Sequence, residues 1–383
     1  MSASFDPVGL TRSLVRADSR NPDLVPGAPG EAPAAAVLRE VLAEWGFRVE
    51  VTEAAPGRPN LVARIGGGRG GASLMLNGHL DTVGVEGMTH DPLGAELRDG
   101  RLYGRGATDM KAGVAAMCAA AARAAARGAL AGEVIVAAVA DEEYESVGTR
   151  ALVAAGVRAD AAIVTEPTRL AICPAHRGFA WITVTVHGRA AHGSRYDIGV
   201  DAIRHAGLLL AELDALEADV LPTRTHPLLG RASLHASLIE GGIGISTYPD
   251  RCVLQLERRT VPGESAADAA REVEAACARV RTRRPTFRAT VEPGFAQGPS
   301  DVAVDAPVMR ALGAALEAAR EPVRIEGMPA WTDAALLNEA GIPAVCFGPG
   351  DIALAHAAEE YVEVREIERA TEVLELMLAR WCG

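Results

Sequence analysis

Features that would indicate several other classes of protein are missing from this chain of 383 residues. It has no unbroken apolar run of about 18 residues, the length that a membrane-spanning helix needs. Its six cysteines are scattered and form no C-x-x-C pair, which favours reduced, buried thiols over disulfides. A formal net charge of -12 without a basic stripe argues against nucleic-acid binding. We therefore expect no membrane partner and no nucleic-acid partner.

The chain also lacks the short motifs of several enzyme classes. There is no G-x-S-x-G nucleophile elbow, no G-x-x-x-x-G-K phosphate loop and no cysteine paired with a motif histidine. Gly66, Gly68 and Gly71 match the dinucleotide fingerprint G-x-G-x-x-G, but a strand is predicted after them where that site needs a helix. We interpret this segment as a hairpin turn. The N-terminus lacks the apolar core of a signal peptide, so we expect a cytoplasmic protein.

The pattern of hydrophobic residues predicts an α/β protein with a mostly parallel sheet. Hydrophobic residues make up 49% of the chain, enough for a real core, and helix-forming segments alternate with short Val/Ile/Leu runs. The dipeptide Asp99-Gly100 indicates a hairpin turn. The predicted helices cover 6–18, 31–45 and 110–127, and the predicted strands cover 47–52, 60–65, 73–78, 134–140, 161–165 and 343–347.

Near residue 177 the pattern changes to that of a half-exposed antiparallel strand. The segment GFAWITVTVHG alternates with a period of two residues. The order strand, helix, two strands, helix, strand over 177–293 is that of a ferredoxin-like α+β unit. Its later elements are predicted at 198–219, 232–239, 250–259, 264–282 and 286–292. We therefore predict a discontinuous domain, 1–176 with 294–383, and a second domain inserted at 177–293.

Metal-binding and acidic side chains follow four of the predicted buried strands. In an open α/β sheet, the crevice beyond the carboxyl ends of the strands is where ligands bind. One such strand end is unremarkable, whereas four together indicate a site. Asp109, directly before the predicted helix 110–127, belongs to the same group. The residues of the group are His79, Asp81, Asp109, Glu142, Glu143, Glu166 and His356.

So many carboxylates in one crevice would repel one another unless cations were bound there. Two histidines with several carboxylates and no cysteine suit zinc, with cobalt or manganese as substitutes. Five protein ligands around a bridging carboxylate would hold two metal ions and leave positions open for water, as catalytic sites do. Structural alternatives exist for single residues: Glu143 as a charge at a helix N-terminus, Asp109 as a helix cap and His356 as a loop residue.

The segments GHLDTV, GRGATDMKAG, DEEYESVGT, TEP and AHAAEEYV resemble the metal-site motifs of the M20 metallopeptidase family. This family includes acetylornithine deacetylase, succinyl-diaminopimelate desuccinylase, aminoacylase-1 and glutamate carboxypeptidase. The resemblance extends over almost the whole chain, with the motifs in order. It implies a zinc-peptidase-like catalytic domain and an inserted lid and dimerisation domain.

The resemblance also implies a role for each residue at the strand ends. Asp109 would bridge both metal ions, His79 and Glu166 would complete one site, and Glu143 and His356 the other.

Two further residues would act beside these ligands. Asp81 would accept a hydrogen bond from the far nitrogen of His79 and so fix its tautomer. Glu142 would be the general base, taking a proton from the metal-bridging water and passing it to the leaving nitrogen.

In the inserted domain and after it, the resemblance implies four residues that meet the substrate. His192, in HGRAAHGS, would enter the partner subunit's active site and stabilise the oxyanion, although it could simply be a polar residue after a strand. Arg259 would grip a substrate carboxylate in preference to Arg258, or could be an exposed arginine at a strand end. Ser246 stands where relatives often have an asparagine, and Trp331 could shape a side-chain pocket.

These observations predict an amidohydrolase that uses two divalent ions, zinc or else cobalt or manganese, to cleave an N-acyl amino acid or a related small molecule. A metallo-dipeptidase or carboxypeptidase is the alternative within the same chemistry. A non-catalytic relative that binds an amino-acid conjugate is an alternative of another class. If His192 acts across an interface, the protein is at least a homodimer, joined through the inserted domain.

Overall fold

The structure is a computed structural model that describes residues 5–383, and the chain forms two compact units. The first unit consists of the chain up to Pro174 together with Val302–Glu326 and Thr332–Gly383. The second unit consists of Ala175–Asp301 and Gly327–Trp331. The second unit therefore contains the predicted insertion of 177–293 and is longer than that insertion at both ends.

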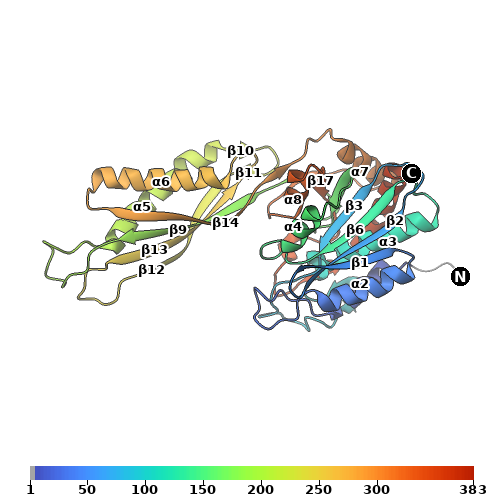
Figure 1. Cartoon of the computed structure of the whole chain (residues 1–383), viewed down its shortest axis with the longest axis horizontal. Coiled ribbons are helices and arrows are strands. Elements are labelled where there is room, and N and C mark those ends of the chain that lie inside the picture. The colour runs from blue at the N-terminus through green and yellow to red at the C-terminus, as the bar shows by residue number, and fades with distance from the viewer. Residues whose placement is uncertain (1–4) are drawn as a thin grey trace. The chain divides into compact units, whose positions relative to one another are not determined.

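The first unit is built on a mixed sheet with strand order β1-β2-β6-β3-β7-β17-β8 (Figure 1). Strands β6, β3, β7 and β17 run parallel, while β1, β2 and β8 pair antiparallel at the two sides. The prediction of a mostly parallel α/β sheet is thus confirmed. The bounds are β1 (Arg48–Ala55), β2 (Arg58–Gly66), β3 (Leu74–His79), β6 (Glu133–Val139), β7 (Ala161–Val164), β8 (Ile172–His176) and β17 (Ala344–Cys346).

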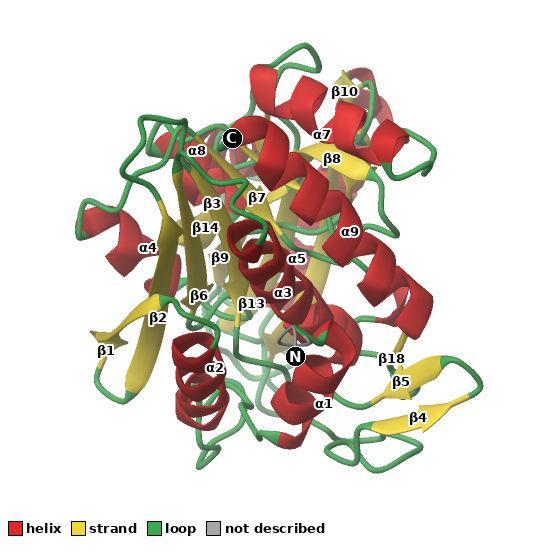
Figure 2. Cartoon of the chain, turned by 90° about the vertical axis from the view of Figure 1, so that its right-hand side faces the viewer, coloured by secondary structure: helices red, strands yellow, loops and turns green. Residues whose placement is uncertain are grey.

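Helices cover both faces of this sheet (Figure 2). The Gly78 backbone lies against Val114 of α3, whereas the Asn77 amide on the opposite face donates to the Thr149 hydroxyl of α4. Helix α3 is rich in alanine, and its small side chains allow α1 and α9 to pack against it. The helices are α1 (Pro7–Arg16), α2 (Ala32–Glu44), α3 (Ala112–Ala126), α4 (Val147–Ala154), α7 (Pro307–Ala318), α8 (Ala334–Glu339) and α9 (Val364–Trp381).

The hairpin predicted at the glycine-rich segment 66–71 is wrong. A strand does follow the glycines, so the dinucleotide fingerprint was rightly rejected, but β2 and β3 are not neighbours because β6 lies between them. The glycines instead allow the chain to pass close to another loop: a Cβ on Gly71 would lie 2.4 Å from the Gly132 nitrogen. Strand β3 pairs parallel with β6 and β7, a long-range pairing that local turn residues cannot indicate.

A small three-stranded sheet joins two distant motifs of the first unit. The predicted hairpin at Asp99-Gly100 is confirmed, since β4 (Glu96–Arg98) and β5 (Arg101–Tyr103) pair antiparallel and both turn residues have positive φ. Strand β18 (Tyr361–Glu363) pairs antiparallel with β5, a pairing that was not predicted. This pairing brings the segment AHAAEEYV beside GRGATD.

The second unit is a four-stranded antiparallel sheet with strand order β12-β13-β9-β14. Helices α5 and α6 pack side by side on it, and the predicted ferredoxin-like order of elements is confirmed (Figure 1). The bounds are β9 (Gly178–His187), α5 (Ala202–Ala215), β12 (Ser233–Gly241), β13 (Arg251–Thr260), α6 (Ala266–Arg283) and β14 (Arg288–Gln297). Shorter elements of the chain are β10 (Thr225–His226), β11 (Gly230–Arg231), β15 (Ser300–Asp301) and β16 (Ile325–Met328), with the helical turns η2 (Leu216–Val220) and η3 (Leu221–Thr223).

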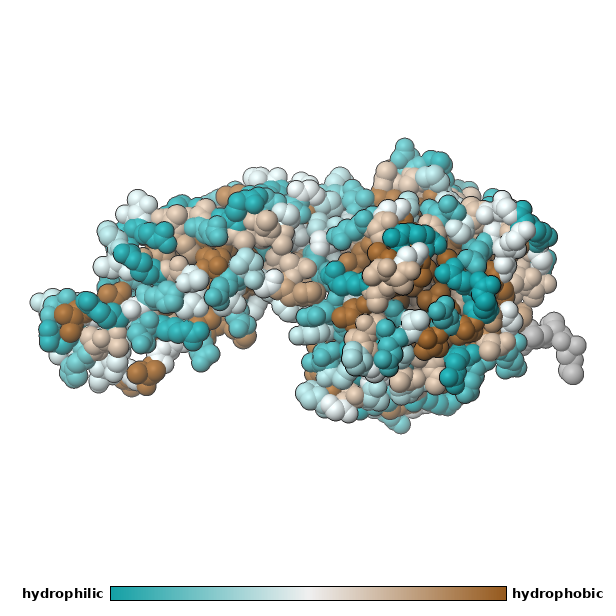
Figure 3. Space-filling view, in the orientation of Figure 1, coloured by the Kyte–Doolittle hydropathy of each residue, from teal (hydrophilic) through white to brown (hydrophobic). Residues whose placement is uncertain are grey.

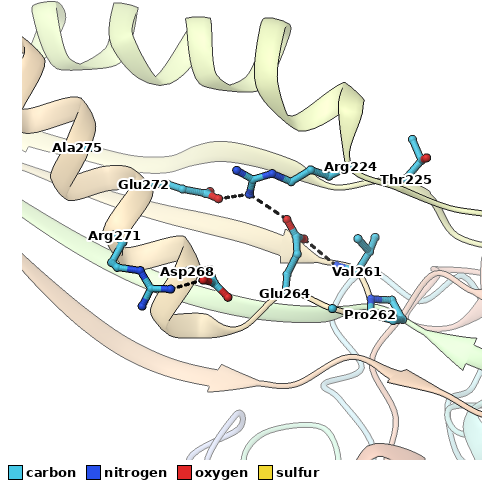
Figure 4. Close-up of a pocket in the computed structure, with 10 residues that line it drawn as sticks. Arg224, Thr225, Val261, Pro262, Glu264, Asp268, Arg271, Glu272 and Ala275 are labelled. Atoms are coloured by element: carbon cyan, nitrogen blue, oxygen red, sulfur yellow. Dashed lines mark hydrogen bonds and ion pairs between the residues drawn. The ribbon is translucent and has the colours of Figure 1, made fainter.

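A surface cavity of about 580 Å³ lies near the start of α6. Figure 4 shows Arg224 there between Glu264 and Glu272, with ion pairs to both. The fully buried Arg258 pairs with the same two glutamates, at 2.5 Å and 3.2 Å. These pairs join β13 to α6, so this cavity is explained by the packing of the second unit.

Within residues 5–383, no helix is both long enough and apolar enough to span a membrane. All six cysteines are free and buried, as predicted.

Candidate metal centre

The polar residues at the strand ends meet at one edge of the first unit's sheet. Because β6, β3, β7 and β17 are parallel neighbours, their carboxyl ends lie at the same edge. His79 is the last residue of β3, Glu142 and Glu143 follow β6, and Glu166 follows β7. His356 follows β17 by way of the short turn η4 (Ile352–Leu354).

Asp109 enters the same edge from a distorted turn, η1 (Ala107–Lys111). Its backbone is extended, with φ -120 and ψ 96, and the Asp109–Met110 peptide bond is cis. Helix α3 begins only at Ala112, later than the predicted residue 110, and its N-cap position is Lys111. The structural alternative that made Asp109 a helix cap is therefore wrong.

The two histidines contact different oxygens of the Asp109 carboxylate. His79 Nε2 lies 3.1 Å from Oδ1, and His356 Nε2 lies 3.5 Å from Oδ2. His356 Nε2 also lies 3.0 Å from Glu143 Oε2. A carboxylate placed between two imidazoles in this way has the arrangement that a ligand shared by two metal ions requires.

His79 is oriented by the main chain of Asp81, whereas a hydrogen bond to the Asp81 carboxylate was expected. Its Nδ1 lies 3.0 Å from the Asp81 carbonyl oxygen and 3.6 Å from the carboxylate. Since a carbonyl can only accept, Nδ1 donates, and Nε2 is left free to face Asp109. The Asp81 carboxylate instead accepts the main-chain N–H groups of Glu142 and Glu143, at 3.1 Å and 3.2 Å.

The donor groups fit divalent cations. One ligand atom each from His79, Glu142 and Glu166 lie within 4.8 Å of one another, and the same holds for His79, Asp109 and Glu143. Glu166 Oε1 is buried and has no hydrogen-bond partner among residues 5–383. A buried carboxylate oxygen without a partner is costly in a protein, and a bound cation would satisfy it.

The pKa values of these groups show how strongly they interact. Burial, and next the charge of Glu166, raise the pKa of Glu142 well above its ordinary value; burial and Asp109 do the same to the pKa of Glu166. Burial would raise the pKa of Asp109, but hydrogen bonds from His356 and His79 outweigh it and lower that pKa. Contacts with Asp109 and Glu143 raise the pKa of the half-exposed His356 to about 10. Without metal, the cluster therefore holds protons that cations would replace.

Asp333 is a further buried carboxylate beside this cluster, and no role was predicted for it. Its Oδ2 accepts a hydrogen bond from the Thr149 hydroxyl at 2.7 Å, and burial raises its pKa to about 6. Its charge acts on Glu142 and Glu166. The T-D-A segment before α8 was visible in the sequence, but the contact with α4 depends on the fold.

The four other predicted site residues, His192, Ser246, Arg259 and Trp331, belong to the second unit. His192 is exposed, and the loops of His192 and Ser246 pair through a main-chain hydrogen bond from Gly193 to Ser246 of 2.7 Å.

Arg259 pairs with Glu257 at 2.7 Å and stacks on the Phe179 ring at 5.4 Å. Trp331 is buried, and its indole donates to the Gly298 carbonyl at 3.0 Å. The roles of all four residues stay predictions.

A sheet edge that gathers two histidines and several buried carboxylates, with one carboxylate placed to be shared, defines a metal-dependent hydrolase. Residues 75–380 match the model of peptidase family M20/M25/M40, and the chain belongs to this family. It is therefore a hydrolase of amide bonds, and membership implies divalent metal ions.

Similar proteins support this placement. The acetylornithine deacetylase of Myxococcus xanthus is 34% identical, over 88% of this chain and 89% of that protein. The N-formyl-4-amino-5-aminomethyl-2-methylpyrimidine deformylase of Bacillus subtilis (strain 168) is 30% identical, over 89% and 87%. A dinuclear metal-binding M20 peptidase from Bacillus subtilis has the same fold, with a TM-score of 0.75, 16% identity and coverage of 98% and 97%.

Proposed function

We propose that this protein removes an acyl group from the nitrogen of an N-acyl amino acid or a related small molecule, with two divalent metal ions and Glu142 as the general base. The observation that carries the proposal is the contact of His79 and His356 with different oxygens of Asp109. Zinc is the proposed ion, with cobalt or manganese as substitutes, because the donors are imidazole and carboxylate groups.

The ligands divide into two sets around Asp109. His79 and Glu166 would hold one ion, and Glu143 and His356 the other. When bound, the two ions would polarise the substrate carbonyl and lower the pKa of water so that it can attack.

Glu142 is placed to move the proton in this reaction. Its Oε2 lies 4.0 Å from His79 Nε2, close to the ligands. In the metal-free protein burial raises its pKa, and general bases are commonly carboxylates whose pKa is raised by burial. Glu142 would take a proton from the attacking water and give it to the leaving amine nitrogen, so that the acid and the free amine are released.

The second unit would supply the groups that recognise the substrate. We propose that His192 of a partner subunit stabilises the oxyanion and that Arg259 binds a substrate carboxylate with two parallel hydrogen bonds. Ser246 would contact the substrate with its hydroxyl group. Trp331 would limit the size of the substrate side chain.

A substrate panel tests the proposal. The zinc-loaded and cobalt-loaded protein would be assayed against N-acetyl, N-formyl and N-succinyl amino acids and against dipeptides, with release of the free amine as the signal. The relatives named above are a deacetylase and a deformylase, so we expect small N-acyl substrates to be cleaved best. Cleavage of dipeptides alone would favour the peptidase alternative, and no cleavage in metal-loaded protein would favour a non-catalytic binding protein.

The surface of the second unit supports a homodimer. Strand β12 is an edge strand, so one row of its main-chain groups is unpaired within the unit's sheet. Leu238 and Ile239 on this strand are 62% and 59% exposed, and Ile243 and Ile245 in the loop after it are exposed as well. Figure 3 shows hydrophobic residues, in brown, among hydrophilic ones on the surface of this unit. Exposed apolar side chains beside an open edge are typical of an interface. We therefore propose that two copies join through this unit.

A further inference from the structure

A buried charge network lies beside the proposed metal ligands without containing any of them. Its centre is Arg58, which is 6% exposed at the start of β2. The Arg58 guanidinium donates two hydrogen bonds to Glu31, at 2.8 Å and 2.6 Å, one to Asp141 at 3.0 Å and one to Asp23 at 2.6 Å. Arg58 thus connects the loop between α1 and α2, the N-cap residue of α2 and the turn that follows β6.

Asn21 connects this network to the strand end that contains His79. Its side-chain amide donates to Asp81 Oδ2 and to Asp141 Oδ1, both at 2.9 Å. Its main-chain N–H donates to the Thr82 carbonyl at 2.8 Å. A single amide group therefore joins the carboxylate two residues after His79 to the carboxylate just before Glu142.

These two carboxylates hold the turn that presents the proposed base and one ligand. Asp81 accepts the main-chain N–H groups of Glu142 and Glu143, and Asp141 accepts those of Glu145 and Val147. Asp141 has a φ of +68, a left-handed conformation that costs a non-glycine residue free energy. Such a conformation persists only where surrounding contacts hold it, and the network supplies those contacts.

The charges of the network depend on one another. Glu31, Asp81 and Asp141 are each at most 1% exposed, so water does little to screen their mutual repulsion. Arg58 brings a positive charge into contact with two of them, and Asn21 brings two N–H donors without adding charge. Loss of either residue would leave buried carboxylate oxygens without a partner, which costs free energy. We therefore expect the turn that contains Glu142 and Glu143 to shift.

We infer that Asn21 and Arg58 are positioning residues that act through Asp81 and Asp141 to fix Glu142 and Glu143 relative to His79. The inference rests on the proposed function for its effect on turnover, but its effect on metal binding can be measured without any substrate.

The test compares Asn21→Ala, Arg58→Met and Arg58→Lys with a matched control, Arg64→Met. Arg64 lies at the other end of the same strand and pairs with Glu133 at 2.7 Å, away from the network. Zinc affinity would be measured on metal-free protein by competition with a chelator, and the folded fraction by circular dichroism. Turnover and KM would be measured on the best substrate of the panel.

We expect zinc affinity to fall about 10- to 100-fold in Asn21→Ala and Arg58→Met, as for the loss of groups that orient metal ligands. Turnover should fall in these variants with little change in KM. Arg58→Lys should lose less zinc affinity and less turnover than Arg58→Met, and Arg64→Met should match the wild type. Folded variants with wild-type zinc affinity would overturn the inference. So would losses that merely follow the unfolded fraction, or equal losses in Arg64→Met. If the wild type cleaves nothing, the proposed function fails, and zinc affinity still decides this inference.

Discussion

At the scale of single residues, the centre depends on two adjacent glutamates with different surroundings. Glu143 contacts His356, whereas Glu142 lies close to His79 and Glu166. Neighbouring side chains diverge beyond a strand end, so one can be a ligand while the other stays available for proton transfer. This divergence supports the assignment of separate roles to Glu142 and Glu143.

Glu142→Gln should keep the metal content and lose turnover. Glutamine has nearly the same shape but cannot take a proton, and a positioned general base contributes between about a hundredfold and ten-thousandfold. Bound metal would be measured by elemental analysis, and turnover on the best panel substrate. The matched control is Glu145→Gln, an exposed residue of the same turn, which should match the wild type. Near wild-type turnover in Glu142→Gln would show that the base is another group.

The stabilisation by zinc should grow as the pH rises from about 5.5 to 8. In metal-free protein, burial raises the pKa values of Glu142, Glu143 and Glu166, so the folded state keeps protons that the unfolded chain has released. Below the ordinary glutamate pKa, these protons make their full contribution to the free energy of unfolding. It is lost as the pH rises through the raised values.

Zinc must replace these protons when it binds. As the pH rises, zinc therefore binds more tightly, while the free energy of unfolding of the metal-free protein decreases. At a hundred times its dissociation constant, a ligand adds about 2.7 kcal/mol to the free energy of unfolding. Chemical unfolding of zinc-loaded and chelator-treated protein at several pH values measures this difference. A stabilisation that is constant or decreases over this range would contradict the raised pKa values.

At the scale of elements, the distance between α3 and β7 controls how closely two ligands approach. Gly113 lies near the start of α3, four residues after Asp109, and a Cβ there would lie 1.9 Å from the Thr165 carbonyl oxygen. Thr165 directly precedes Glu166. Glycine at position 113 therefore allows the helix and the strand to bring Asp109 and Glu166 to the same edge.

Gly113→Ala should destabilise the first unit and weaken zinc binding. Overpacking of this kind usually costs about 1–3 kcal/mol, because the helix must move away from the strand. The matched control is Gly313→Ala in α7 of the same unit, where a Cβ would meet Val323 at an ordinary 3.8 Å. Alanine there should be neutral or stabilise by up to about 1 kcal/mol, since it favours a helix. Chemical unfolding and zinc titration of both variants provide the measurement; equal effects would refute the packing argument.

Elements with a clear local pattern were predictable from the sequence, whereas pairings between distant elements were not. The buried strands β3, β6 and β7 appear as short apolar runs, and β9 as an alternating one. Nothing local indicates that β18 pairs with β5. That pairing brings Glu360 next to Asp109. The Glu360 carboxylate accepts the main-chain N–H of Asp109 at 3.2 Å and pairs with Arg105 at 2.6 Å.

At the scale of the whole molecule, the second unit should decide the oligomeric state. The double variant Leu238→Lys and Ile239→Lys places two charges on the open edge strand, where a second copy would have to bury them. Sedimentation velocity should show a dimer for the wild type and a monomer for this variant, with turnover reduced if His192 acts across the interface.

The matched control for this experiment is Val304→Lys. Val304 is 60% exposed and belongs to the first unit, so its variant should stay dimeric. A wild type that is monomeric and fully active would contradict both the dimer and the role of His192 in a partner subunit.

The sequence by itself determined which residue types stand at the ends of the buried strands, and in which order. It therefore predicted the α/β class, the ferredoxin-like insertion and the set of histidines and carboxylates at one sheet edge. These features depend on local periodicity and on the rule that parallel strands end at a common edge, and both can be applied to the linear sequence alone.

The tertiary structure decided how those side chains are held. It placed the Asp81 carboxylate on the turn of Glu142 and not on His79, and it joined Asn21 and Arg58 to Asp141. These contacts connect segments that are tens of residues apart in the chain, and they arise from the packing of whole elements. No local pattern of the chain encodes them, because their free energy exists only when the elements have come together.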